Sequence, residues 1–422
     1  MMFETKQYTY LLEQGKVEEA NQFFNKVFSE GTDEEVFDLA EEVRQLGFLE
    51  EAKKLYNRLL ERYPDEGELL VALAEIYIQL DEEDEALSIL EKITKDDPFY
   101  VQSLLLLADL YEAQGLFEVS VQKLLQAEKI APNEPIIQFA LAELYASIGR
   151  FAEAVYKYEH ILKDTTEIAN INLHKRLADV YAASGEFEKA LHHYDHALED
   201  QLDIDVLFGY GLTAYQAGFY EKAIEKLSDV KELDHEYFSL YLPLAKSYEH
   251  IEDLENALKT LREGQEVNPF QKELHFLAGK INLKLGNEMD AEECLLEAIK
   301  LDPSYLDAYL TLNKLYLSNE RNEDLIHLAE PLLAEGEEDP DFLWDYAIAC
   351  EKEEKYSDAL NAYRSAYRYL KENNEFLQSY GFFLIEEGNY TEAIEVFNKL
   401  QKSDPTNVEY MDVLERLKTN LS

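Results

Sequence analysis

Three histidines in one short stretch have the spacing of metal ligands. His192, His193 and His196 lie in the stretch HHYDH, and His160 precedes them in the chain. His192 and His196 are four positions apart, so a helix would place both imidazoles on one face, as metal-binding helices do. An exposed helix also tolerates histidines freely. We therefore expect His192 and His196 to be solvent-exposed and to hold no metal.

The sequence carries no signature of catalysis. It contains no GxSxG, HExxH, CxxC or Gly-rich phosphate-binding motif. Its two cysteines, Cys294 and Cys350, are far apart, which argues against a disulfide framework or a cysteine-based zinc site and is typical of a reducing compartment. Carboxylate pairs carry no information in a chain with 88 Asp and Glu residues. The sequence therefore predicts a protein that is not an enzyme and has no cofactor and no metal.

The charge of the chain restricts its partners. There are 39 Lys and Arg residues against 88 Asp and Glu, a net charge of −49. Such a surface repels nucleic acid and anionic membranes and attracts basic protein segments, or it serves only to keep the protein soluble. Apolar stretches are too short to span a bilayer, and Met1 to Tyr10 lack the pattern of a signal peptide. We expect a cytoplasmic protein whose partners are other proteins or peptides.

A small residue recurs along the chain with a period of about 34 residues. The intervals between successive members are 32, 34, 34, 34, 36 and 33 residues, followed by five of 34. The series consists of Ala20, Ala52, Ala86, Ser120, Ala154, Ala190, Ala223, Ala257, Ala291, Leu325, Ala359 and Ala393. One supersecondary unit is thus repeated about a dozen times.

Other columns keep the same period. If the recurring small residue is called position 20, position 8 is also small in most repeats, as at Ala40, Ala74 and Gly211. Position 11 holds tyrosines such as Tyr77, a glycine ends the first half of most repeats, and a proline such as Pro64 closes many of them. This pattern resembles the tetratricopeptide repeat (TPR), a helix–turn–helix unit. In length, acidity and repeat number the chain is similar to the YpiA-type TPR proteins of Gram-positive bacteria.

The resemblance implies an all-α fold, a right-handed α-α superhelix of about twelve helix pairs. Residues 408–422 have apolar residues at helical spacing and are expected to form a capping helix. Pro243 is expected to interrupt the first helix of its repeat, and Pro331 lies inside a second helix. The expected repeats are 1–32, 33–66, 67–100, 101–134, 135–170, 171–203, 204–237, 238–271, 272–305, 306–339, 340–373 and 374–407.

The first helix of each repeat lines the concave groove of TPR proteins, and position 9 lies on that face. This column is acidic in the first half of the chain, with Glu41, Glu75, Asp109, Glu143 and Asp179. In the second half it holds Lys246, Lys280 and Lys314, and Lys284 extends the basic stretch. Position 5 adds Phe208, Phe276 and Trp344 as candidate apolar anchors, although such residues also support the core.

Members of the TPR family that clamp a terminal carboxylate combine a lysine at position 5 with an asparagine at position 9. Here Lys175 meets the first requirement, but Asp179 replaces the asparagine. We therefore expect a scaffold or adaptor that binds partner segments along its groove, basic ones at the acidic half and acidic ones at the lysines. The alternative is a structural protein that self-associates through the groove or its ends.

Overall fold

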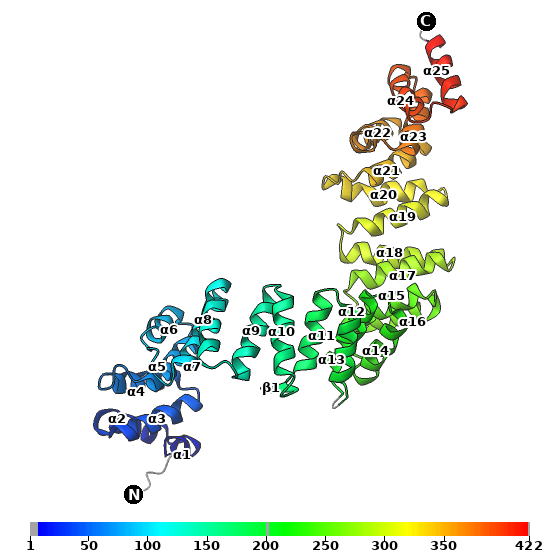
Figure 1. The fold of residues 1–422 in the computed structure, drawn as a ribbon. Helices are drawn as coiled ribbons and strands as arrows, with labels where there is room; N and C mark the ends of the chain where they lie inside the picture. Colours follow the sequence, from blue (N-terminus) through cyan, green and yellow to red (C-terminus); the bar gives the residue numbers. More distant parts are fainter. Residues whose placement is uncertain (1–6, 200–201, 421–422) are drawn as a thin grey trace. The chain divides into compact units, whose positions relative to one another are not determined.

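The computed structural model describes residues 7–199 and 202–420, and these residues form the predicted helix-turn-helix array. Within these residues, helices pair antiparallel in chain order, giving twelve pairs and a last single helix (Figure 1). The first six residues expected in the first repeat, residues 200 and 201 of the sixth, and the last two of the capping segment lie outside the described ranges. The chain divides into two units, Met1–Gly209 and Tyr210–Ser422.

Unit 1 contains six complete helix pairs. In each pair after the first, the first helix bears positions 5 to 13 of the repeat, and in all six pairs the second helix bears position 20. The helices are α1 (Gln7–Glu13), α2 (Val17–Glu30), α3 (Asp33–Gln45), α4 (Leu49–Leu60), α5 (Gly67–Gln79), α6 (Glu83–Leu90), α7 (Tyr100–Ala113), α8 (Phe117–Ile130), α9 (Pro135–Ser147), α10 (Phe151–Ile161), α11 (Leu173–Ala183) and α12 (Phe187–Ala197).

Unit 2 begins within the first helix of the seventh pair and ends with the single helix. Its helices are α13 (Ile204–Gln216), α14 (Tyr220–Leu233), α15 (Tyr241–His250), α16 (Leu254–Val267), α17 (Lys272–Lys284), α18 (Glu288–Leu301), α19 (Leu306–Ser318), α20 (Asn322–Ala334), α21 (Pro340–Lys352), α22 (Tyr356–Leu370), α23 (Asn374–Glu386), α24 (Tyr390–Ser403) and α25 (Val408–Asn420). A short 3-10 helix, η1 (Phe238–Leu240), precedes α15.

Small residues are required where the two helices of a pair approach each other. A Cβ atom added to Gly279 would lie 2.7 Å from Cγ of Leu295, which is 16 positions further along the chain. Gly211 stands in the same relation to Leu227. Because a larger side chain at this point would force the helices apart, position 8 stays small. Ser120 also fits at position 20, since its buried hydroxyl donates a 2.7 Å hydrogen bond to the carbonyl oxygen of Ala108.

Each turn between paired helices needs one residue with a left-handed backbone. Glycine takes this conformation in most turns, for example at Gly47 with φ of 81°. Four turns lack glycine, and there Asp81, Glu252, Glu320 and Glu354 adopt φ values of 59°, 63°, 57° and 56°. The helix pair therefore forms even where the turn residue has a Cβ atom, because packing of the two helices over-determines the turn.

A β-hairpin, which the sequence pattern did not predict, joins the fifth and sixth pairs. Strand β1 (Glu167–Ile168) pairs antiparallel with β2 (Ile171–Asn172). The two residues between the strands, Ala169 and Asn170, both have positive φ, as a tight type I′ hairpin turn requires. This insertion accounts for the interval of 36 residues, the longest in the repeat series.

The interruption predicted at Pro243 takes the form of a change of helix type, because the first helix of the eighth pair begins as the 3-10 helix η1 and continues as α-helix from Tyr241. Helix α15 begins at Tyr241, so Pro243 lies in its first turn, where a backbone N–H has no partner within the helix. Ser247 donates a 2.7 Å hydrogen bond to the carbonyl oxygen of Pro243. Pro331 does lie inside a helix, α20, as the sequence indicated.

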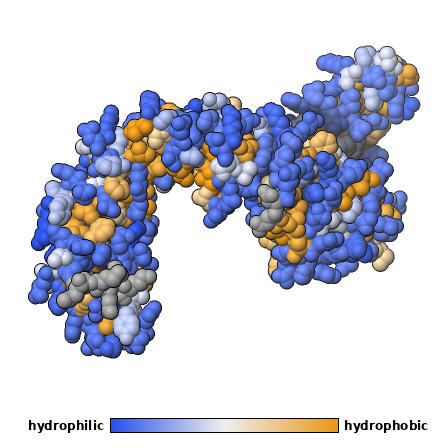
Figure 2. All heavy atoms as spheres, turned by 60° about the horizontal axis from the view of Figure 1, so that its bottom comes forward, coloured by the Kyte–Doolittle hydropathy of each residue, from blue (hydrophilic) through white to orange (hydrophobic). Residues whose placement is uncertain are grey.

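Hydrophilic residues cover most of the face visible in Figure 2, with apolar patches between them. Among the described helices, none is long and apolar enough to cross a membrane.

Candidate functional site

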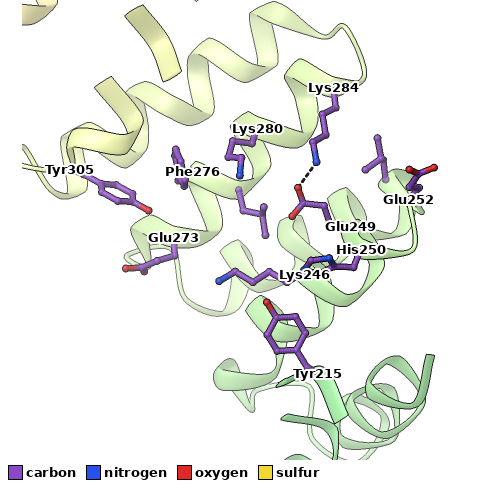
Figure 3. A pocket seen from close by; sticks show the side chains of 12 residues that line it. Tyr215, Lys246, Glu249, His250, Glu252, Glu273, Phe276, Lys280, Lys284 and Tyr305 are labelled. Carbon is purple, nitrogen blue, oxygen red and sulfur yellow. Dashed lines mark hydrogen bonds and ion pairs between the residues drawn. The ribbon is translucent and has the colours of Figure 1, made fainter. Parts of the chain in front are cut away.

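Several of the predicted groove residues converge on one cavity in unit 2. The cavity has a volume of about 800 Å³, and Figure 3 shows its lining. We call it the lysine pocket; it is lined by Tyr215, Lys246, Glu249, His250, Glu252, Leu254, Glu273, Phe276, Leu277, Lys280, Lys284 and Tyr305. Three of the four predicted lysines and one of the three predicted aromatic anchors are therefore brought together.

The first helices of three successive pairs build most of this pocket. Tyr215 is near the end of α13, Lys246 lies on α15, and Lys280 lies on α17. The two lysines occupy the same position of neighbouring repeats, 34 residues apart, so the stacking of α17 on α15 directs both toward the same space. Tyr305, which immediately precedes α19, completes the wall.

The lysines of the pocket differ in what neutralises them. Nζ of Lys284 lies 2.6 Å from Oε1 of Glu249, whose side chain is only 16% exposed. Lys280 has its ammonium 5.6 Å from the ring centroid of Phe276, a cation–π contact. Among the described residues, no carboxylate lies within ion-pair distance of Lys246 or Lys280. The pocket thus presents two ammonium groups that have no anionic partner.

Lys314 and Trp344 lie outside the lining of this pocket. Lys314 is exposed, whereas Trp344 is half-buried and packs edge-on against Phe376, with ring centroids 5.6 Å apart. The indole N–H of Trp344 is buried and has no hydrogen-bond partner among the described residues. Phe376 belongs to the following pair, so Trp344 contributes to the core between the eleventh and twelfth pairs, as the alternative interpretation of position 5 allowed.

A buried carboxylate follows Trp344 in the chain. Oδ2 of Asp345 and both amide atoms of Asn313 are buried without a hydrogen-bond partner among the described residues. Burial raises the pKa of Asp345 to about 6, although the positive charge of Lys314 opposes the shift. Asn313 occupies position 8, where most repeats have Ala or Gly, so the tenth pair buries an amide at this position.

Tyrosines of the second helices form hydrogen bonds with three of the five carboxylates in the acidic position-9 column of unit 1. Tyr56, Tyr158 and Tyr194 each lie 15 positions after the carboxylate to which they donate: Glu41, Glu143 and Asp179, respectively. Burial and the neighbouring carboxylate raise the pKa of the Tyr56 and Tyr158 hydroxyls. Three of the five acidic groove residues therefore satisfy the hydroxyl of a tyrosine that is itself buried.

Arginines neutralise part of the same column. Nη2 of Arg44 lies 2.8 Å from Glu41 and Nη1 lies 3.3 Å from Glu75, so one guanidinium bridges two successive repeats. Burial alone would raise the pKa of Glu41, but Arg44 and Tyr56 hold it below its usual range. Arg176 similarly lies 3.2 Å from Glu143. Of the five carboxylates, Asp109 is the exposed one, and no hydrogen bond to it is found among the described residues.

One more predicted position, Phe208, and the already described Asp179 lie near the end of unit 1. Phe208 is half-buried on α13. Asp179 is half-buried; burial raises its pKa, although the hydrogen bond from Tyr194 opposes the rise. The structure therefore assigns the Asp179 carboxylate an intramolecular role that its sequence position did not reveal.

The histidine group contains one member that the sequence did not indicate. His174, on α11, packs among the histidines of α12: its Nδ1 lies 2.9 Å from Nδ1 of His193, and its ring centroid lies 5.0 Å from that of His196. His192 is exposed, and the side chain of His196 is 37% exposed. In the described ranges no group of three or more His, Cys, Asp or Glu side chains is placed to hold a metal ion.

Comparison with known proteins decides the family. The chain is 41% identical to the TPR repeat-containing protein YpiA of Bacillus subtilis (strain 168) over 412 residues, which are 98% of this chain and 97% of that protein. This chain belongs to the YpiA-like family of TPR proteins. Models of YpiA-like tetratricopeptide repeats match residues 112–166 and, for the C-terminal repeats, 340–407. Tetratricopeptide repeat models also match residues 44–110, 175–234 and 273–305.

The chain also has more distant similarities. A TPR-containing protein of Caenorhabditis elegans, trd-1, is 26% identical over 34% of this chain and 18% of its own length. The crystal structure of YrrB, described as a TPR protein with an unusual peptide-binding site, matches with a TM-score of 0.39 and 19% identity over 44% of this chain and 95% of its own. The Naa15/Naa10 complex bound to HypK matches with a TM-score of 0.39 and 18% identity over 90% of this chain and 64% of that one.

Proposed function

We propose that this chain is a non-enzymatic scaffold or adaptor that binds segments of partner proteins on the faces formed by its first helices. Repeat solenoids of this kind present extended binding surfaces, and TPR proteins generally act as protein-interaction scaffolds. The observation that carries the proposal is the convergence of Lys246, Lys280 and Lys284 with Phe276 on one cavity of unit 2. Lys314 extends the same basic column.

Two properties of the lysine pocket support a binding role. Its volume of about 800 Å³ lies within the range of ligand sites, and its lining combines five apolar or aromatic side chains with three lysines, three glutamates and a histidine. Within the part of the chain that the structure describes, Lys246 and Lys280 have no carboxylate within ion-pair distance, although the net charge of the chain is −49. Two such cations in one cavity favour an anionic partner group.

For unit 1 we propose a complementary surface that receives a basic segment. Its support is the acidic column, in which no tyrosine of the described ranges donates a hydrogen bond to Glu75 or Asp109, and Asp109 is exposed. Glu41, Glu143 and Asp179 belong to the same column, but their hydrogen bonds to tyrosines limit how far they can turn toward a partner. Phe208 would add apolar contact area in this unit.

The charge of the chain also supports the choice of partner class. Phosphate backbones and anionic lipid surfaces would be repelled by a net charge of −49, so we propose proteins or peptides in the cytoplasm as partners. A second copy of the chain remains an alternative occupant, because one copy carries both acidic and basic columns.

Charge reversal tests the proposal. A variant with Lys246, Lys280 and Lys314 changed to Glu is compared with wild type in affinity capture followed by mass spectrometry, and helicity is checked by circular dichroism. We expect partners to be lost, with the association rate of purified partners falling and its dependence on salt changing. Lys259→Glu on α16, whose side chain is 72% exposed outside the pocket, is the matched control.

Unit 1 is tested by reversing Glu75 and Asp109 to Lys, which leaves the tyrosine-bonded carboxylates in place. Light scattering at several concentrations separates a scaffold from a self-associating protein. The proposal is wrong if the partner set and the affinities are the same in wild type and in both reversal variants.

A further inference from the structure

The walls of the lysine pocket are assembled before any ligand binds. On one side, the ring of Tyr215 lies 6.0 Å from that of Tyr220 and 6.1 Å from that of His250. Tyr220 and His250 stack on each other with centroids 4.2 Å apart and ring planes 3° from parallel. Aromatic side chains supported in this way lose little conformational freedom when a ligand binds.

The opposite wall is held equally firmly. The rings of Phe276 and Tyr305 meet edge-on with centroids 5.1 Å apart. Nζ of Lys272 lies 4.7 Å from the centroid of Tyr305 and forms an ion pair with Asp302 that fixes its position. Burial, reinforced by the charge of Glu273, raises the pKa of Tyr305 to about 12, so its hydroxyl stays protonated and can donate a hydrogen bond.

Two ammonium groups stand between these walls. Figure 3 shows the side chains of Lys246 and Lys280 extending into the space between Tyr215 and Phe276, while Lys284 turns toward Glu249. Lys284 is thus neutralised by Glu249 in the lining of the pocket, and the other two lysines are left to meet a ligand. Carboxylates that pair with them would bring their chain across the aromatic walls.

The spacing of the two lysines restricts the ligand. They stand on α15 and α17, which contact each other, and the axes of packed helices are about 8–10 Å apart. An extended chain rises about 3.3 Å per residue, so carboxylates two or three residues apart span a comparable distance. We propose that the lysine pocket binds a short acidic segment of a partner protein in which two such carboxylates flank a bulky apolar side chain, which lies between Tyr215, Phe276 and Tyr305. This inference rests on the scaffold function proposed above and names the partner segment for one site.

Fluorescence anisotropy with a labelled peptide tests the inference. The probe is Gly-Ser-Glu-Ala-Phe-Glu-Ser-Gly, and the control peptides replace both Glu by Lys or Phe by Ala. We expect the full-length protein to bind the probe and each control peptide to bind about tenfold more weakly or not at all. Lys246→Ala and Lys280→Ala should each weaken binding of the probe by about fivefold to tenfold, whereas Lys259→Ala should leave it unchanged. Rising salt should weaken binding of the probe to wild type.

Several outcomes would overturn the inference. The inference is wrong if the full-length protein does not bind the probe, or if the Lys-substituted peptide binds as tightly as the probe. It is also wrong if a Lys246→Ala/Lys280→Ala double variant binds the probe like wild type. If the Phe-to-Ala peptide binds as tightly as the probe, the pocket is an anion site that uses no apolar anchor, and the inference fails as well. If the double variant still captures the wild-type partner set, the scaffold proposal stands and only the assignment of this pocket fails.

Discussion

The hydroxyl of Tyr194 on α12 donates a 2.7 Å hydrogen bond to Oδ1 of Asp179 on α11. The same relation, 15 positions apart, joins Tyr56 to Glu41 and Tyr158 to Glu143. A residue that faces the groove in the repeat pattern thus serves the packing of its own pair. Hydrogen bonding to buried tyrosine hydroxyls therefore explains part of the acidic position-9 column of unit 1, independently of any partner.

We predict that Tyr194→Phe destabilises the sixth pair by about 1–3 kcal/mol, because a half-buried carboxylate loses a hydrogen-bond donor. Hydrogen exchange of residues 173–197 is the measurement, since stability in a repeat array is local. Tyr156→Phe is the control, because the Tyr156 side chain is 66% exposed, and it should change exchange little. Unchanged exchange in Tyr194→Phe would show that the hydrogen bond carries no net stability.

We predict that Gly279→Ala destabilises the ninth pair by about 1–3 kcal/mol, the usual range for overpacking. Alanine gains about 1 kcal/mol of helix propensity over glycine, but its Cβ would lie 2.7 Å from Cγ of Leu295. Gly209→Ala on α13 is a milder change, because the nearest atom there is the hydroxyl of Tyr194 at 3.0 Å. Urea unfolding compares the two variants, and a more stable Gly279→Ala protein would contradict the explanation of position 8.

We predict that acid weakens the sixth pair through its histidines. Burial, together with the charge of His174, lowers the pKa of His193 to about 4, and burial also lowers the pKa of His174. Between about pH 6.5 and 4 the unfolded chain therefore binds more protons than the folded one, so stability falls as the pH falls through this window.

The loss attributable to His193 is well below the roughly 3.4 kcal/mol to which about 2.5 pKa units correspond, because its imidazole is half-exposed and solvent screens its charge. Hydrogen exchange at pH 7.0 and 5.0 is the measurement, and His193→Gln should flatten the dependence. His327→Gln, at a side chain that is 72% exposed, should not. The interpretation is wrong if His193→Gln and wild type lose the same stability between the two pH values.

We predict that Asp345→Asn stabilises the eleventh pair at neutral pH. The pKa of Asp345 is raised from 3.8 to about 6, so ionisation costs the folded state more than the unfolded one. This cost is absent below about pH 4, grows up to about pH 6 and then stays constant at about 3 kcal/mol. Chemical unfolding followed across pH 4.5–7.5 should show an advantage of the variant that increases with pH. If the difference in unfolding free energy between the variant and wild type did not change with pH, ionisation of Asp345 would not be its cause.

The sequence by itself determined the repeat and its helix pairs. Small residues recurring every 34 positions, such as Ala257 and Ala291, specify where two helices touch, and this information is local to each repeat. The charge of position 9 could be read in the same way, including the change from Asp179 to Lys246. The hairpin at 167–172 left only a trace, the interval of 36 residues, because its two extra residues follow no periodic pattern.

Only the tertiary structure decided which charged groups are available to a partner. Tyr215, Lys246 and Tyr305 occupy different repeats and different repeat positions, so their convergence depends on how successive pairs stack. Likewise, Lys284 and Glu249 are 35 residues apart, and because they form an ion pair, Lys284 is not one of the lysines available to a partner. Pairing between charges depends on distances across helices, which periodicity along the chain does not encode.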